Sequence, residues 1–131
     1  SERAKLTIPA DSVTPRNSHA ASGLDSCLVM EQPQPGYEEM CFYHHLTGTP
    51  AVEIFNPDLG KGLAMTFDTA ELAYFTQWKM MGIKEYVLGL EPGNCTPDGR
   101  DVMRKQGRLR MLQPGEQTML HLKWEIKEES K

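Results

Sequence analysis

The sequence predicts an all-β fold, an antiparallel β-sandwich with one or two short helical turns. Short apolar and aromatic runs recur along the chain, and turns rich in proline and glycine, such as 47–50 and 56–60, separate them. Residues 63–67 and 119–126 alternate apolar and polar side chains, the period of a half-buried strand. Several short strands between turn signals are typical of an antiparallel sandwich rather than of alternating strands and helices.

The first half of the chain carries the first strands of this sandwich. Residues 5–9 have the composition of a short strand. Residues 25–36 contain two prolines and a closing glycine, which predicts a loop. The aromatic run 40–45 and the apolar run 52–55 are each followed by turn residues, so we expect both to be strands, with 63–67 as the next.

The second half continues the same pattern. Asp68 is placed to cap one helical turn over 68–72. Residues 74–79 and 86–91 are predicted strands, and residues 101–106 a brief helix that Gly107 would end. A turn at 113–116 leads into the last strand, whose apolar side chains share one face: Leu120, Leu122, Trp124 and Ile126.

Composition narrows the classes of function. Lys and Arg number 14 against 18 acidic residues, a net charge of −4, so we expect no nucleic-acid partner. No apolar stretch approaches the roughly 18 residues of a membrane span, and residues 1–5 lack a signal-peptide core, so we expect no membrane partner and a cytoplasmic protein. Three scattered cysteines predict free thiols. The sequence contains no Cys-x-x-Cys or His-x-x-x-His pair, so we expect no metal site.

The most informative run is 86–97, in which a carboxylate ends an apolar strand. Pro92 biases Glu91 toward extended geometry, and Gly93 allows a sharp turn. Alternation puts Glu91 on one face with Gly89, which has no side chain and leaves space beside the carboxylate. From the residues alone two roles remain open: Glu91 binds a ligand hydroxyl, or it caps the following turn.

Two motifs resemble one known superfamily. Leu90–Asn94 and Leu112–Glu116 look like the C-terminal signature of galactose mutarotase-like (aldose 1-epimerase) proteins. The run from Trp78 to Asn94 is similar to a bacterial branch of aldose 1-epimerase-like proteins, and the resemblance spans roughly 15–126. It implies that residues 1–131 are a single domain, the C-terminal portion of a mutarotase-like supersandwich, with 1–15 and 128–131 poorly ordered.

The resemblance also implies a chemistry. Glu91 matches the general base that takes the proton from the anomeric hydroxyl of a sugar, and no cofactor is required. The family's acid histidine lies in the upstream half, so this chain alone would present a base without its acid. The alternatives are a non-catalytic carbohydrate-binding domain and a remnant domain that only associates. Half a sandwich would expose an apolar face, so we expect a homo-oligomer or association with a missing half-domain.

Four further residues are predicted to bind the sugar. Trp78 suits stacking on a sugar ring, and Lys79 suits hydrogen bonding to hydroxyls, whereas the alternatives are core packing and solvent exposure. Asn94 either binds a ligand or belongs to the turn. His44 and its neighbour His45 lie on opposite strand faces, so at most one can enter a cleft; we place His44 in the site.

Overall fold

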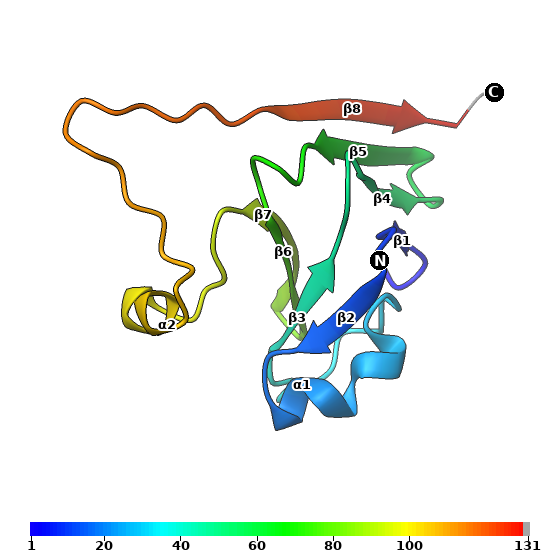
Figure 1. Ribbon diagram of the computed structural model, residues 1–131. Helices are drawn as coiled ribbons and strands as arrows, with labels where there is room; N and C mark the ends of the chain where they lie inside the picture. Colours follow the sequence, from blue (N-terminus) through cyan, green and yellow to red (C-terminus); the bar gives the residue numbers. More distant parts are fainter. Residues whose placement is uncertain (130–131) are drawn as a thin grey trace.

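The computed structural model describes residues 1–129 and consists of two four-stranded antiparallel sheets (Figure 1). The first sheet has the order β1 (Lys5–Thr7), β4 (Ala51–Asn56), β5 (Lys61–Phe67) and β8 (Leu122–Glu128). The second has the order β2 (Ser12–Pro15), β3 (Met40–His45), β6 (Tyr74–Gly82) and β7 (Glu85–Gly93). The prediction of an antiparallel all-β sandwich is confirmed.

Short helices fill the connections. They are α1 (Ser18–Ser22), the single-turn 3-10 helix η1 (Leu24–Ser26) and α2 (Arg100–Lys105). Asn17 caps α1 by accepting a hydrogen bond from the Ala20 amide at 2.8 Å. At the predicted cap Asp68, the carboxylate accepts from the Ala70 amide, but the segment stays a turn without a helix.

The N-terminal segment has more order than its sequence indicates. Strand β1 pairs with β4, with Lys5 opposite Phe55, and β2 pairs with β3, with Val13 opposite His44. Both strands are short, and each pairs with a strand about 30 to 50 residues away. Hydrophobic periodicity and composition are local features and do not reveal such distant pairing. At the other end, Glu128 closes β8, and residues 130–131 lie outside the described part of the chain.

The main core lies between the sheets. Phe67 of β5 and Phe75 of β6 stack with their ring centroids 5.7 Å apart, so the two sheets are in direct contact. Leu88 and Leu90 of β7 pack against this core from the inner side. The buried residues of the cluster are Leu6, Ile8, Val52, Met65, Phe67, Leu72 and Phe75.

A second core covers the rest of the inner face of the second sheet. Phe42 is fully buried there against Ala20 of α1 and Cys27. Because α1, η1 and the following loop lie over this part of the sheet, the side chains beneath them are shielded from solvent (Figure 1). Their position decides which of the predicted site residues can reach a ligand.

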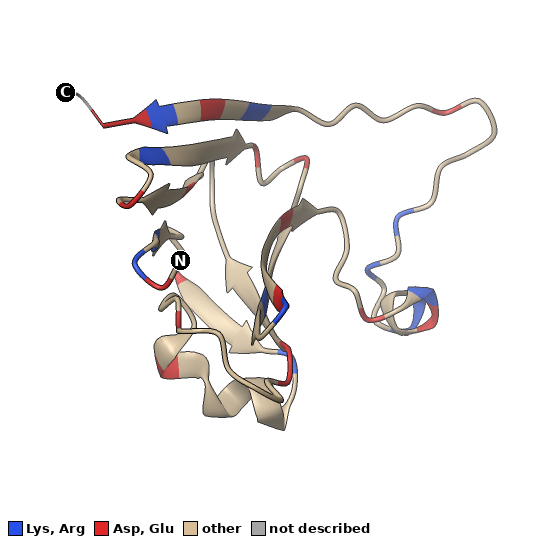
Figure 2. Cartoon of the chain, turned by 180° about the vertical axis from the view of Figure 1, so that it is seen from behind, with Lys and Arg blue, Asp and Glu red and all other residues tan. Residues whose placement is uncertain are grey.

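Strand β8 has one charged and one apolar face. Register places Leu122, Trp124 and Ile126 on the same face as Phe67, Met65 and Leu63 of β5, toward the sandwich interior. These three β8 side chains nevertheless remain exposed, Trp124 at 53%. Charged residues of both signs alternate with them along the strand (Figure 2). The first sheet therefore extends beyond the second and leaves an apolar surface.

Candidate functional site

Glu91 lies near the end of β7, which is the edge strand of the second sheet. Its side chain is exposed on the outer face of that sheet. Register aligns Thr14, Tyr43, Thr76 and Glu91 in one row across the four strands, and Cys41, Trp78 and Gly89 in the next. We call the surface formed by these two rows the Glu91 face.

The carboxylate of Glu91 turns back along its strand. One of its oxygens stands against the position that a Cβ of residue 89 would take, and the Cβ of Trp78 lies 3.2 Å from the same position. Gly89 therefore provides the space that the carboxylate occupies, which agrees with the gap expected from the sequence. A larger residue at position 89 would push the carboxylate away.

Trp78 borders the carboxylate on β6. Its indole N–H donates a hydrogen bond of 2.6 Å to the Glu39 carboxylate, which fixes the ring orientation. The side chain is half-buried, so part of the ring remains accessible. An accessible ring beside a carboxylate is an arrangement that sugar-binding surfaces use, because the ring covers the apolar C–H face of a pyranose.

A polar network lies beside these two residues on the same face. Asp98 accepts hydrogen bonds from the Tyr43 hydroxyl at 2.9 Å and the Thr96 hydroxyl at 2.7 Å, and the Arg16 Nε lies 3.9 Å from its carboxylate. Arg16 also donates to the Cys41 thiol at 3.9 Å. No sequence pattern indicates this network, because Arg16 and Asp98 belong to distant connections that only the fold brings together.

Electrostatics fix the protonation of the network. The bond from Thr96, followed by that from Tyr43 and the charge of Arg16, holds the pKa of Asp98 below its usual value. Burial, together with the bond to Asp98 and its charge, raises the pKa of Tyr43 to about 12. Asp98 is therefore a carboxylate and Tyr43 a neutral donor over the ordinary range of pH. Burial raises the pKa of the Cys41 thiol, and the negative charges of Glu39 and Glu91 act in the same direction.

Lys79 lies on the opposite, inner face of the sheet. It is 1% exposed, and its ammonium group donates to the Ser26 carbonyl at 3.1 Å and to the Glu31 carboxylate at 2.7 Å. The alternation of Trp78 and Lys79 predicted from the sequence is present. The loop that covers the inner face removes Lys79 from the Glu91 face, so its predicted role in sugar binding has no geometric support.

His44 is also on the inner face, 3% exposed, with Nε2 2.8 Å from the Gln77 side-chain oxygen. Burial lowers its pKa, opposed by the bond to Gln77. Its predicted place in the site is therefore corrected: His44 and Glu91 project from opposite faces. His45 does lie on the Glu91 face, but its ring nitrogen is 3.0 Å from the Thr14 hydroxyl on β2, on the side away from β7.

Asn94 follows β7 and is exposed. It lines a polar cavity of about 370 Å³ with the segment 110–118. Glu91 does not line this cavity. Asn94 is thus near Glu91 in sequence but faces a different hollow.

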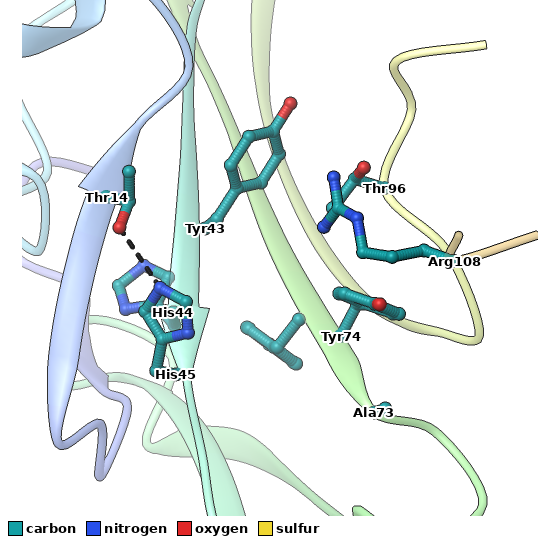
Figure 3. A pocket seen from close by; sticks show the side chains of 9 residues that line it. Thr14, Tyr43, His44, His45, Ala73, Tyr74, Thr96 and Arg108 are labelled. Carbon is teal, nitrogen blue, oxygen red and sulfur yellow. Dashed lines mark hydrogen bonds between the residues drawn. The ribbon is translucent and has the colours of Figure 1, made fainter. Parts of the chain in front are cut away.

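A further cavity of about 270 Å³ lies where β2, β3 and β6 meet the segment that follows β7 (Figure 3). Its lining residues are Thr14, Tyr43, His44, His45, Ala73, Tyr74, Phe75, Thr96 and Arg108. Tyr43, bonded to Asp98, belongs both to this cavity and to the polar network of the Glu91 face.

The four histidines are all engaged elsewhere. His19 bonds to the Glu38 carbonyl and His121 to the Glu71 carboxylate, while His44 and His45 bond to Gln77 and Thr14. Within residues 1–129, no group of three or more His, Cys, Asp or Glu side chains is arranged to hold a metal ion. Nor does this part of the chain contain a helix of the length and apolar character needed to span a membrane.

A solved structure has the same fold as this chain. A crystal structure from Klebsiella pneumoniae subsp. pneumoniae, described as a "putative aldose 1-epimerase", superposes with a TM-score of 0.90 at 29% sequence identity. The match covers 98% of this chain and 35% of that chain, so this chain spans about a third of the relative. The fold is therefore that of a partial mutarotase-like domain, as the resemblance implied.

The family follows from the sequence model that matches the chain. Residues 1–126 match the family described as "Domain of unknown function (DUF4432)", and the protein belongs to that family. No curated protein matches the chain.

Proposed function

We propose that the Glu91 face binds a free or modified aldose, and that in a complete domain Glu91 acts as the general base that interconverts the sugar's anomers. The observation that carries this proposal is the exposed carboxylate of Glu91, set beside Trp78 in the space above Gly89. The likeness to the Klebsiella structure supports it, since that structure is described as an aldose 1-epimerase-type protein.

In the proposed reaction, Glu91 takes the proton of the anomeric hydroxyl. The bond between C1 and the ring oxygen breaks, the anomeric oxygen becomes the aldehyde oxygen, and an acid protonates the ring oxygen. Rotation about the C1–C2 bond and the reverse steps give the other anomer, with both protons returned. Each positioned proton-transfer group typically contributes about 10²–10⁴-fold. No redox step or external reactant is needed.

The neighbouring groups suit the binding of hydroxyls. Asp98 is an acceptor held as a carboxylate, and Arg16 is an exposed donor beside it. Trp78 offers an apolar ring. We assign these three residues to sugar binding together with Glu91. Asn94 stays a candidate sugar contact only as an exposed residue of the turn after β7, since it lines a separate hollow. Lys79 and His44 are left out because they are buried on the inner face.

The acid is proposed to come from outside these residues. The four histidines of the chain all bond to groups other than Glu91, as described above. This observation also favours the second candidate function, a domain that binds sugar without catalysis. We further propose that the apolar face of β8 is covered by another chain or chain segment, and that the protein works in the cytoplasm, where its three free thiols would stay reduced.

The test compares two glutamates of β7 that share one strand face. Glu91→Gln removes the proposed base, and Glu85→Gln is the matched control at the far end of the same strand. Saturation-transfer NMR against a panel of aldoses measures binding, and polarimetry measures anomerisation. We expect wild type to give saturation-transfer signals from a sugar. These signals should be weaker with Glu91→Gln and unchanged with Glu85→Gln.

The two outcomes separate the candidate functions. If sugar binds but wild type and Glu91→Gln anomerise it at equal rates, Glu91 is not the base. The second candidate function, a non-catalytic sugar-binding domain, would then be supported. Silence across the whole panel would reject both sugar functions.

A further inference from the structure

The cavity next to the Tyr43–Asp98 pair has an uneven charge. Its lining includes one permanent cation, Arg108, and none of its nine lining residues is Asp or Glu. The Asp98 carboxylate lies behind the wall, where Tyr43 and Thr96 donate to it and the charge of Arg108 acts on it. The cavity holds about 270 Å³, just below the lower end of typical small-molecule pockets, which are about 300–1,000 Å³. The cation lines the cavity and the carboxylate does not, so the charged group that a small ligand would meet is Arg108.

Arg108 is held in a way that leaves donors available. Its guanidinium carbon lies 5.5 Å from the centre of the Tyr74 ring, so one flat side of the group is stacked. Its edge carries the N–H donors, and one of these bonds to the Gln106 side chain. Within residues 1–129 Arg108 forms no salt bridge at or below 4.0 Å. Stacking on Tyr74 thus orients a cation whose other edge donors are free for an oxyanion.

The opposite wall supplies further polar groups. Thr14 and His45 form a pair 3.0 Å apart on β2 and β3, and both are exposed. Figure 3 shows the side chain of Arg108 extending across the cavity, from the segment after α2, toward the strand that carries Tyr43 and His45. The cation and the hydroxyl–imidazole pair therefore approach the same space from two sides.

We propose that this cavity is a second ligand site, which binds the oxyanion of a small molecule, a phosphate or a carboxylate. Arg108 supplies the charge, Tyr74 orients it, and the Thr14–His45 pair donates one hydrogen bond from the opposite wall. The site is separate from the proposed base, because Glu91 does not line the cavity. Occupancy of the cavity therefore does not depend on the sugar chemistry proposed for Glu91.

The test is a titration followed by ¹H–¹⁵N NMR with three probes: inorganic phosphate, acetate and, as a neutral probe, glucose. Sodium chloride at matched ionic strength corrects for screening. We expect saturable shifts for Thr14, His45 and Arg108 with phosphate or acetate, and the stronger of the two identifies the type of oxyanion. Glucose, a probe for the Glu91 face, should leave the Arg108 signal unchanged.

Two arginine variants give the proposal a matched comparison. Arg108→Gln should weaken anion binding about tenfold or more, because it removes the charge-assisted hydrogen bonds to the oxyanion. Arg104→Gln, an exposed arginine of α2, should stay within about twofold of wild type. Thr14→Val tests the opposite wall without touching Arg108, and it should weaken binding by a smaller factor.

Three results would overturn the site. The first is a set of chemical shifts that grow linearly with probe concentration and never saturate. The second is an equal loss of anion affinity in Arg108→Gln and Arg104→Gln. The third is a cluster of shifts elsewhere on the molecule. If Arg108→Gln disturbs the fold, Arg108→Lys and Thr14→Val replace it as the test. The proposal requires both variants to bind the anion more weakly than wild type.

Discussion

The carboxylate of Glu91 occupies the space that Gly89 leaves by having no side chain. The two residues are neighbours on one face of β7, and Trp78 closes the space from β6. The position of the proposed base thus depends on a glycine in a strand, where glycine is otherwise unfavourable. We therefore expect residue 89 to control the site through geometry alone.

Gly89→Ala should reduce sugar binding or anomerisation roughly ten- to a hundredfold, since a displacement of about 1 Å in a positioned group can have effects of this size. The backbone at residue 89 is an ordinary strand, but the new Cβ would also lie 3.2 Å from the Trp78 Cβ, so stability should fall slightly and by much less than function. Polarimetry and sugar NMR measure function, while thermal unfolding measures stability. A loss of stability that parallels the loss of function would contradict the geometric explanation.

Lys79→Met should destabilise the protein by about 3 kcal/mol. The substitution removes a buried cation and leaves the Glu31 carboxylate and the Ser26 carbonyl without their donor; breaking a buried pair by removing one partner typically costs about 3–5 kcal/mol. Glu31 is partly exposed, which favours the lower end. Urea unfolding measures the effect, and Lys105→Met on α2, an exposed lysine, is the control. Equal stability of the two variants would show that the pair contributes little.

Lys79 shows which features of the site can be predicted from the sequence and which cannot. Period-two alternation correctly separated Trp78 from Lys79. It did not say which face is buried, because that depends on Glu31, 48 residues away in a segment that is a loop by composition. In the same way Glu91 and Gly89 were predicted from neighbouring residues, whereas Arg16 and Asp98 meet only through the pairing of β2, β3 and β6.

The stability of the protein should fall as the pH drops below 6.5 because of His44. Burial holds the pKa of His44 below its ordinary value of 6.5, so as the pH falls the unfolded chain binds this proton before the folded protein does. The stability linked to a neutral His44 is complete above pH 6.5 and is lost as the pH falls toward the lowered value. Urea unfolding at pH 7.5, 6.5 and 5.5 follows this change in wild type.

The matched variant for this prediction is His44→Gln, which cannot titrate in that range. Its stability should vary less than that of wild type between the same pH values. The imidazole signal of His44 in NMR provides a direct check, since it should titrate below 6.5. A His44 signal that titrates above 6.5 would contradict the burial argument.

The exposed apolar face of β8 leads to a prediction about mass in solution. Leu122, Trp124 and Ile126 point toward the sandwich interior yet remain 39%, 53% and 73% exposed. Val52, Ile54, Leu63, Met65, Leu88, Leu90 and Trp124 line an apolar hollow of about 310 Å³ beside them. Burial of apolar surface is worth roughly 25 cal/mol per Å², so this face should drive association of the isolated chain.

Light scattering after gel filtration should therefore give a mass of at least twice the 14.8 kDa of one chain. Trp124→Ser should shift the protein toward monomer, because it removes the largest apolar side chain of the face. Lys123→Ser, on the opposite face of the same strand, should leave the mass unchanged. A monomeric wild type that does not bind a hydrophobic dye would mean that β8 covers its own apolar side chains in solution, and the proposed partner for this face would then be unnecessary.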